Sequence, residues 1–320
     1  MRILITGGAG FIGSNFVRHV LKKYSRYQVI NLDKLTYAGN LDNLRDVEKY
    51  KNYRFIKGDI CDYKLAKKIT KNCDWVVNFA AESHVDRSIV DAKLFINTNV
   101  FGTYSLLRAA KENKIKRFLH IGTDEVYGSC SHGRCAEERI LNPSNPYSAS
   151  KAAADLLVKS FYATYKFPVL ITRSTNNFGP YQYPEKMIPL FLTNALENKK
   201  LPLYGKGINV RDWLFVLDNC EAIDLVLHKG KIREIYNIAA DNYLSNLKLT
   251  KLILKKLHRP ESLIKFVTDR RGHDLRYSLN CAKIRSLGWR PRHSFSRAMD
   301  ITMNWYKENS WWWRKLKAKS

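Results

Sequence analysis

The stretch that decides the fold is Arg2-Ile-Leu-Ile-Thr-Gly-Gly-Ala-Gly-Phe-Ile-Gly13, near the start of the chain. An apolar run over residues 2–6 ends in Gly7, Gly10 and Gly13, and a helical pattern follows from residue 14. Glycine permits a positive φ and lets the backbone come close to a bound group. A helix that starts at such a loop presents free amides and a positive dipole to phosphate. We therefore expect a strand–loop–helix unit that binds a nucleotide; an ordinary structural turn is the alternative.

Outward from this stretch, short apolar runs alternate with helix-length segments, which indicates parallel strands joined by helical crossovers. The runs expected to form further strands are 28–32, 53–56, 74–79, 117–121 and 169–172. The segments expected to form helices are 14–24, 99–113, a helix from Tyr147, 218–228 and 246–257. Beyond about residue 175, prolines interrupt the alternation. We expect an α/β fold: a doubly wound, parallel Rossmann-type sheet in residues 1–175 and a smaller, mixed substrate-binding domain in residues 176–320, with some interleaving of elements.

Composition limits the possible partners. The 320 residues carry 55 Lys and Arg against 29 Asp and Glu, a net charge of +26, but the basic residues are dispersed and form no basic arm. This favours a small anionic substrate over nucleic acid, although a polyanion partner stays an alternative. The sequence has no apolar stretch of membrane-spanning length and no signal-peptide pattern, so we expect neither a membrane partner nor export.

Cysteine usage points to a reducing compartment. The six cysteines are too sparse for a disulfide framework in a chain of 320 residues, so we expect a cytoplasmic protein. Two of them lie in Cys130-Ser-His-Gly-Arg-Cys135, which lacks a fourth ligand at the spacing of a zinc site. We expect free thiols in a loop and no metal.

The acidic residue after the second predicted strand bears on the choice of nucleotide. Asp33 follows Gly13 by 20 residues, where a carboxylate accepts hydrogen bonds from ribose hydroxyls and repels a 2′-phosphate. This favours NAD over NADP, and the neighbouring Lys34 could weaken the preference. Asp59 would reach the adenine end, or would instead cap a helix.

Tyr147 and Lys151 are candidates for acid–base chemistry. Residues four apart share one face of a helix, and Pro146 places this tyrosine near a helix start. A nearby ammonium stabilises phenolate over phenol, so we expect Lys151 to lower the pKa of Tyr147. Such a pair takes a proton from a hydroxyl while a nicotinamide accepts the hydride. Thr123 ends the preceding strand, at the edge where ligands collect.

Together these motifs resemble the extended short-chain dehydrogenase/reductases that act on nucleotide sugars, and in particular the dTDP-glucose 4,6-dehydratases. The resemblance spans about residues 1–313, and its most specific piece is Thr123-Asp-Glu-Val-Tyr-Gly128. The other matching motifs are Asp33-Lys-Leu-Thr-Tyr-Ala-Gly-Asn40, Ala80-Ala-Glu-Ser-His-Val-Asp-Arg-Ser88, Tyr147-Ser-Ala-Ser-Lys151, Arg173-Ser-Thr-Asn-Asn-Phe-Gly-Pro-Tyr-Gln182, Tyr204-Gly-Lys-Gly-Ile-Asn-Val-Arg-Asp-Trp213 and Asp269-Arg-Arg-Gly-His-Asp274. Arg271 departs from the family, which usually has proline there, and leaves the shape of that loop in doubt.

The acidic pair explains why this motif discriminates among the family's reactions. Once sugar carbon 4 is a ketone, the proton on carbon 5 becomes acidic, and Glu125 can abstract it. Water leaves carbon 6 only when its hydroxyl is protonated, which calls for a neutral acid, Asp124. Thr123 would bond the oxygen on carbon 4. The alternative without a catalytic role is that Asp124 and Glu125 cap a helix or are simply solvated. The functional alternatives are a UDP-glucose 4-epimerase, a UDP-glucuronate decarboxylase, or a non-catalytic protein that binds NAD or a polyanion.

The resemblance also implies the binding residues and the assembly. NAD would be held by Gly7, Gly10, Phe11, Ile12, Gly13, Asp33, Lys34, Thr36, Asp59, Ile60, Ala80, Ser83, Asn99, Tyr147 and Lys151. The nucleotide sugar, dTDP-glucose, would meet Ser83, Asn176, Glu185, Lys186, Arg211, Asn246, Arg270 and His273. We expect hydrogen-bonding, structural roles for His84 and His273. Family members form homodimers through helices near 99–113 and 147–165. The tail, Trp311-Trp-Trp313 and the basic residues to Lys319, could suggest a membrane interface, but we expect the tryptophans to pack against the second domain.

Overall fold

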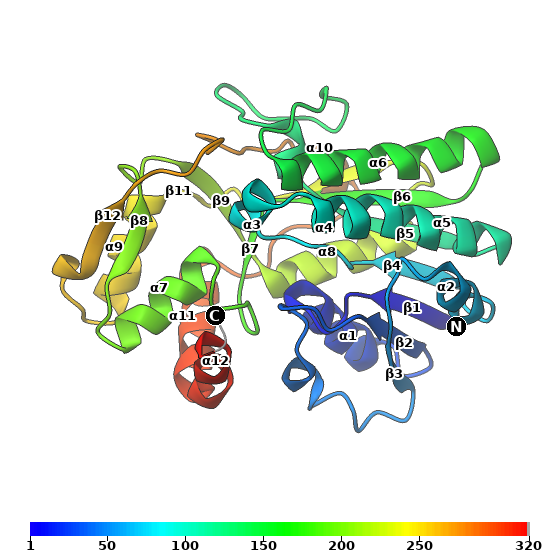
Figure 1. Cartoon of the computed structure of the whole chain (residues 1–320), viewed down its shortest axis with the longest axis horizontal. Coiled ribbons are helices and arrows are strands. Elements are labelled where there is room, and N and C mark those ends of the chain that lie inside the picture. The colour runs from blue at the N-terminus through cyan, green and yellow to red at the C-terminus, as the bar shows by residue number, and fades with distance from the viewer. Residues whose placement is uncertain (319–320) are drawn as a thin grey trace.

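The computed structural model describes residues 1–318, and the last two residues of the second predicted domain, including Lys319, lie outside the described residues. A seven-stranded parallel sheet forms the larger part, in the order β10-β6-β5-β4-β1-β2-β3 (Figure 1). Its strands are β1 (Arg2–Thr6), β2 (Gln28–Asp33), β3 (Tyr53–Lys57), β4 (Trp75–Asn78), β5 (Arg117–Thr123), β6 (Val169–Ser174) and β10 (Ile235–Ile238). The expected doubly wound sheet is confirmed, and six of its strands lie where the apolar runs predicted them.

Helices cover both faces of this sheet. One face carries α2 (Tyr63–Thr70), α5 (Thr103–Glu112) and α6 (Pro146–Tyr165), and the other carries α1 (Phe11–Lys23) and α8 (Val216–Lys229). Neighbouring residues of β1 show why the strands are apolar throughout: Leu4 packs under α2 and α5, whereas Ile3 and Ile5 pack under α1. A strand covered on both faces has no polar side.

The smaller part lies at the carboxyl end of the sheet, on the left in Figure 1, and contains two small sheets. Strands β7 (Asn176–Phe178), β9 (Val210–Phe215) and β11 (Tyr243–Ser245) form one, and β8 (Leu201–Tyr204) and β12 (Ile264–Val267) form the other. Its helices are α7 (Met187–Leu196), α9 (Asn246–Lys256), α11 (Phe295–Glu308) and α12 (Ser310–Lys317). The elements interleave, because β10 and α8 come from the second half of the chain but belong to the large sheet.

Short segments join these elements: α3 (Val85–Val90), α4 (Lys93–Phe95), the π-helical η2 (Ile96–Gly102), α10 (Ala282–Ser286), and the 3-10 turns η1 (Leu41–Leu44), η3 (Asp124–Tyr127) and η4 (Glu261–Leu263). The helix predicted over 99–113 is therefore η2 continuing into α5. No helix among residues 1–318 is long and apolar enough to cross a membrane.

The tryptophans of the tail were all expected to pack against the second domain. The structure confirms this for two of the three rings. Trp312 and Trp313 are buried in the core of the smaller part, and Trp311 stays partly exposed over the guanidinium of Arg45. Trp312 Nε1 also donates to Asn43 Oδ1 at 2.8 Å, and Asn43 Nδ2 donates to the backbone oxygen of Ala9. The tail is thereby joined to the glycine loop.

Candidate active site

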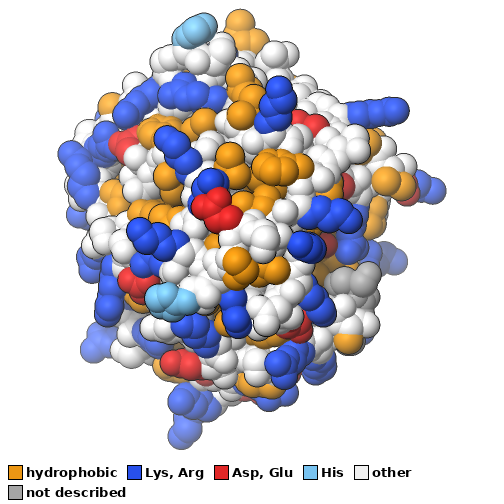
Figure 2. Space-filling model, turned by 90° about the vertical axis from the view of Figure 1, so that its left-hand side faces the viewer, with side chains coloured by type: hydrophobic (Ala, Val, Ile, Leu, Met, Phe, Trp, Pro, Cys, Tyr) orange, Lys and Arg blue, Asp and Glu red, His pale blue; other side chains and the backbone are white. Residues whose placement is uncertain are grey.

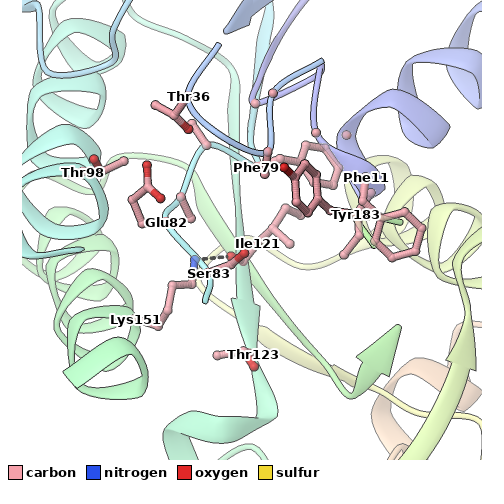
Figure 3. A pocket seen from close by; sticks show the side chains of 18 of the residues that line it. Phe11, Thr36, Phe79, Glu82, Ser83, Thr98, Ile121, Thr123, Lys151 and Tyr183 are labelled. Atoms are coloured by element: carbon pink, nitrogen blue, oxygen red, sulfur yellow. Dashed lines mark hydrogen bonds between the residues drawn. The ribbon is translucent and has the colours of Figure 1, made fainter. Parts of the chain in front are cut away.

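A cavity of about 310 Å³ opens where the carboxyl ends of β1, β2, β4, β5 and β6 meet. In doubly wound sheets this edge is where ligands bind, because the loops that follow neighbouring strands diverge there. Figure 3 shows Phe11 and Tyr183 on one side of the cavity and Lys151, Thr98 and Glu82 on the other. The edge that the sequence singled out is therefore hollow.

The glycine loop forms one wall of this cavity. Gly7 has φ +72°, and a side chain there would come within 2.6 Å of the Ala80 amide nitrogen, while one on Gly13 would collide with the carbonyl of Gly7. Gly10 begins α1 without any side-chain cap, so the first-turn amides are free to meet an anion. These features fit the pyrophosphate of the expected dinucleotide.

Two acidic residues near the loop, Asp33 and Asp59, also line the cavity. Asp33 Oδ2 accepts from the Ala9 amide at 2.9 Å and Oδ1 accepts from the Leu35 amide at 2.8 Å, which leaves a further acceptor site on each oxygen. Lys34 pairs with Asp59 at 2.7 Å. The alternative that Asp59 caps a helix is wrong, because Asp62 caps α2 by accepting from the Leu65 amide.

Fourteen of the fifteen expected NAD residues line this cavity: Gly7, Gly10, Phe11, Ile12, Gly13, Asp33, Lys34, Thr36, Asp59, Ile60, Ala80, Ser83, Tyr147 and Lys151. Asn99 does not line it. Its Oδ1 accepts from the Glu82 amide, and its Nδ2 donates to the Glu82 carbonyl oxygen and to Ser150 Oγ, the latter at 2.8 Å. Asn99 therefore fixes the segment after β4 to α6, and its neighbour Thr98 reaches the cavity instead.

Tyr147 and Lys151 lie one turn apart on α6, and both line the cavity although they are almost fully buried. The expected lowering of the tyrosine pKa is wrong for this arrangement. Burial and the charges of Glu125 and Asp124 raise the pKa of Tyr147, although a hydrogen bond with Thr123 opposes them. Lys151 Nζ donates to the backbone oxygen of Ile121 at 2.6 Å (Figure 3), and burial lowers its pKa to about 8.

The acidic pair after β5 sits in two different environments. Burial, then repulsion from Glu125, raises the pKa of Asp124 to about 8, so this carboxyl is largely protonated at neutral pH. Burial also raises the pKa of Glu125, but the positive charges of Arg270, Arg211 and Lys186 oppose the rise. Among the described residues, Asp124 Oδ2 and Glu125 Oε2 have no hydrogen-bond partner. The pair is therefore a candidate acid beside a candidate base.

A second cavity of about 220 Å³ adjoins the first, and the two share Glu125, Asn176, Glu185 and Lys186. All the expected substrate residues line one or both cavities: Ser83, Asn176, Glu185, Lys186, Arg211, Asn246, Arg270 and His273. The arginines are not ordinary surface residues. Arg211 is buried, stacks on Tyr277 and donates to three backbone oxygens, and Arg270 Nε is buried without a partner among residues 1–318.

The two histidines within the motifs both make local hydrogen bonds at the edge of the second cavity. His84 caps α3 by accepting from the Arg87 amide, which confirms a structural role. His273 Nδ1 donates to Asp269 Oδ1 at 2.6 Å, and its ring packs edge-on against Tyr204. Both histidines also line the second cavity. Among the described residues no cluster of potential metal ligands occurs, and Cys130 and Cys135 are free and buried.

Sequence reasoning missed several cavity residues that its own motifs contained. Glu82 is buried with its carboxyl toward the cavity. Tyr37 also lines the cavity: burial and then the charge of Glu185 raise the pKa of its hydroxyl, and the guanidinium of Arg87 stacks on its ring at 3.9 Å. Thr175, directly after β6, lines the cavity and opposes the rise in the pKa of Asp124. Each lies within three residues of a predicted site residue, so spacing within the motif was the available signal. Only the fold shows which members of a motif face the cavity.

Comparisons with known proteins agree with this geometry. The model of a family described as GDP-mannose 4,6 dehydratase matches residues 4–302. A dTDP-glucose 4,6-dehydratase of Streptomyces niveus is 50% identical, over 99% of this chain and 96% of its own. The low-salt glycan biosynthesis protein Agl12 of Haloferax volcanii is 51% identical, over 96% and 98%.

Among solved structures, DesIV, the dTDP-glucose 4,6-dehydratase of Streptomyces venezuelae crystallised with NAD and TYD, superposes with a TM-score of 0.97. It is 49% identical, and the match covers 99% of this chain and all of that one. A UDP-glucose 4-epimerase of Thermus thermophilus with NAD matches at 27% identity and a TM-score of 0.89. The chain thus belongs to the GDP-mannose 4,6 dehydratase family and, within it, groups with the dTDP-glucose 4,6-dehydratases.

Proposed function

We propose that this protein is an NAD-dependent dTDP-glucose 4,6-dehydratase, a hydro-lyase that forms dTDP-4-keto-6-deoxyglucose. The observation that carries the proposal is the acidic pair Asp124 and Glu125, placed beside Tyr147 at the junction of the two cavities. Relatives at about half identity over the full length have this activity in their names. An epimerase needs no such acids, because its keto sugar only rotates in the site and is reduced again at carbon 4.

Each residue has a distinct part in the mechanism. Tyr147 takes the proton from the hydroxyl on carbon 4, with Thr123 beside the same oxygen and Lys151 stabilising the phenolate. Bound NAD would accept and later return the hydride, and its ring charge would favour that phenolate. Glu125 then removes the proton from carbon 5, and Asp124 protonates the leaving hydroxyl on carbon 6. Two carboxyls with different pKa values can divide acid and base work in this way.

We place the nucleotide part of the substrate in the second cavity. Arg211 and Arg270 bring permanent positive charge to this cavity, which suits a pyrophosphate. Tyr204, Trp213 and Phe191 offer aromatic surface for a base. Residues 1–175 would thus bind chiefly the cofactor and residues 176–320 chiefly the nucleotide sugar.

The test is to incubate the NAD-loaded protein separately with dTDP-glucose, with UDP-glucose and with UDP-glucuronate. We expect the alkali-induced absorbance of a 4-keto sugar with dTDP-glucose. UDP-galactose as the product from UDP-glucose would indicate an epimerase, and carbon dioxide release from UDP-glucuronate would indicate a decarboxylase. Absence of turnover together with salt-sensitive binding to DNA would favour the polyanion alternative.

On the face that Figure 2 shows, Lys and Arg are scattered rather than gathered into one patch.

The assembly and location belong to the proposal as well. Phe101, Tyr104, Leu156 and Tyr165, in η2, α5 and α6, each expose 40% or more of their surface. Such a face supports a homodimer through these helices, and light scattering should report twice the monomer mass. The six cysteines are free, which is consistent with a cytoplasmic location.

A further inference from the structure

Behind Lys151, on the side away from the cavity, three buried titratable side chains converge that the mechanism above does not use. They are His120 on β5, Asp155 on α6 and Arg173 on β6, and each is at most 1% exposed. Burying charged groups is costly unless they are paired, so such a cluster calls for an explanation.

The distances form a chain that starts at the catalytic lysine. Lys151 Nζ lies 3.5 Å from His120 Nε2, which in turn lies 3.7 Å from Asp155 Oδ1. The other carboxylate oxygen, Oδ2, accepts from Arg173 Nε at 2.8 Å. Oδ1 is buried and has no hydrogen-bond partner among residues 1–318. Arg173 therefore satisfies one side of the carboxylate, and the other side faces the imidazole and the lysine.

The surrounding amide fixes the state of the imidazole. Asn78 Oδ1 accepts from Thr6 Oγ1 at 2.6 Å, so Asn78 Nδ2 is the group that faces His120 Nδ1 at 3.3 Å. Since an amide nitrogen only donates, Nδ1 must accept, and the ring proton belongs on Nε2. Burial and the charges of Lys151 and Arg173 hold the pKa of His120 well below its ordinary value. The ring is therefore a neutral spacer with its N–H beside the free carboxylate oxygen.

Local sequence creates this arrangement. Tyr147, Lys151 and Asp155 are spaced by four residues and so share one face of α6. On the opposing strand, a side chain at Gly122 would come within 2.8 Å of the Thr172 carbonyl oxygen and 3.2 Å of Asp155 Oδ1. Glycine at this position keeps the space beside the carboxylate clear.

We propose that His120 and Asp155 are positioning residues for Lys151: the neutral imidazole fills the gap between the amine and the carboxylate with its N–H toward Asp155, and the free oxygen of Asp155 attracts the charge of the amine and keeps it protonated. The inference rests on the proposed function only for the use that Tyr147 makes of the ammonium. The titratable and charged groups around Lys151 are His120, Asp155, Tyr147, Arg173 and, in η3, Tyr127, Asp124 and Glu125. Among them Asp155 supplies the attraction that opposes the effect of burial.

The test follows Lys151 directly, by NMR of protein labelled at the lysine side chains, with Lys151→Met identifying the resonance. In the parent protein Lys151 should titrate near pH 8. Asp155→Asn should lower this pKa by about one unit or more, as expected when an opposite charge is removed. The control is Asp218→Asn, which alters another buried aspartate, paired with His293 at 2.7 Å and outside both cavities, and should leave the titration unchanged. An unchanged titration in folded Asp155→Asn protein would overturn the proposal, whether or not the protein turns over dTDP-glucose.

A second pair of variants decides the matter if Asp155→Asn does not fold, since Arg173 would then lack its partner. His120→Gln keeps an N–H donor that can face Asp155 Oδ1, and His120→Phe keeps only the bulk of the ring. We expect single-turnover oxidation at carbon 4 to slow by roughly tenfold or more in the Phe variant and far less in the Gln variant. In the Phe variant, the loss of activity at alkaline pH should also begin at a lower pH than in the parent protein. Equal rates and equal pH profiles in the two variants would contradict the role of His120.

Discussion

Asp124 and Asp224 are two buried aspartates, 3% and 1% exposed, whose acidities have moved in opposite directions. Asp124 follows β5 at the cavity, and its pKa is raised to about 8, first by burial and then by Glu125. Asp224 lies between α1 and α8 on the far face of the sheet. Burial alone would raise the pKa of Asp224 too, but hydrogen bonds from His19, His228 and Lys23 hold it well below its usual range.

The difference shows that partners, rather than burial, decide the state of a buried carboxyl. Lys23 Nζ lies 2.6 Å and His228 Nδ1 lies 3.0 Å from the Asp224 carboxylate, and the Tyr24 hydroxyl donates to the same group. Asp124 has a second acid for a neighbour and no cation in ion-pair contact within the described residues. The unpaired acid lies where a reaction needs a proton donor, and the paired one lies where two helices need an anchor.

The largest effect should come from the partner of the unpaired acid. Glu125→Gln removes the base that takes the proton from carbon 5, so overall turnover should fall by about a thousandfold. Oxidation at carbon 4 should still occur, because Tyr147 is untouched, and reduced NAD should accumulate. Stopped-flow absorbance of the reduced cofactor measures this directly. Tyr147→Phe is the matched control, in which no reduced NAD forms; equal loss of oxidation in both variants would refute this division of roles.

Asp124→Asn should slow elimination by about a hundredfold, because an amide cannot protonate the departing hydroxyl. In the parent protein, elimination should weaken as the pH rises past about 8, since the acid must hold its proton and its pKa is about 8. The variant should lack this decline. Rapid-quench measurement of water loss across pH 6–10 distinguishes the two, and a persistent decline in the variant would assign it to another group.

Asp224→Asn tests the other side of the comparison and should alter stability instead of catalysis. We expect a loss of about 2 kcal/mol in the free energy of unfolding at pH 7, because partly buried cations lose their partner. Because the folded-state pKa of Asp224 is lowered, its contribution is present above about pH 4 and is lost as the pH falls. Denaturant melts should therefore show the full difference between parent and variant at pH 7 and a smaller difference at about pH 2.5, because the contribution is lost only below about pH 4. A change in kcat of the folded variant would show that the two regions are not independent.

The smallest effect should come from His228→Gln, which removes one of those partners. Burial lowers the pKa of His228, but its hydrogen bonds with Asp224 outweigh burial and raise it overall. The contribution of a raised group is complete below about pH 6.5 and disappears as the pH rises through the folded-state pKa. We expect a difference of less than about 1 kcal/mol at pH 5.5 that diminishes by pH 8, measured by the same melts. A difference that grows with pH would contradict the sign.

The sequence predicted those parts of the fold and site that depend on local patterns, and it failed where contacts between distant segments decide the outcome. Strands β1 to β6 and the glycine loop could be read from local apolar runs and spacing, because a strand covered on both faces is apolar throughout. Strand β10 was not foreseen in the sheet, because its four residues, Ile235–Ile238, include Asn237 and lie beyond the prolines that interrupt the alternation of strands and helices. The motifs placed the candidate site at the edge of the sheet where the cavity lies, but they could not show that Asn99 turns away or that burial and the charge of Glu125 raise the pKa of Tyr147. Those outcomes depend on solvent exposure and on charges from two elements, η3 and α6, that only the fold brings to Tyr147.

The contact between Trp312 and Asn43 has a consequence for chimaeric proteins. Asn43 bonds on one side to the last helix, α12, and on the other to Ala9 in the glycine loop, and Lys315 pairs with the adjacent Asp42 at 2.8 Å. Exchanging the carboxyl-terminal third between relatives would break this three-way junction unless η1 is exchanged with it. Segment swaps intended to change the preferred sugar nucleotide should therefore keep residues 41–44 and α12 from the same parent.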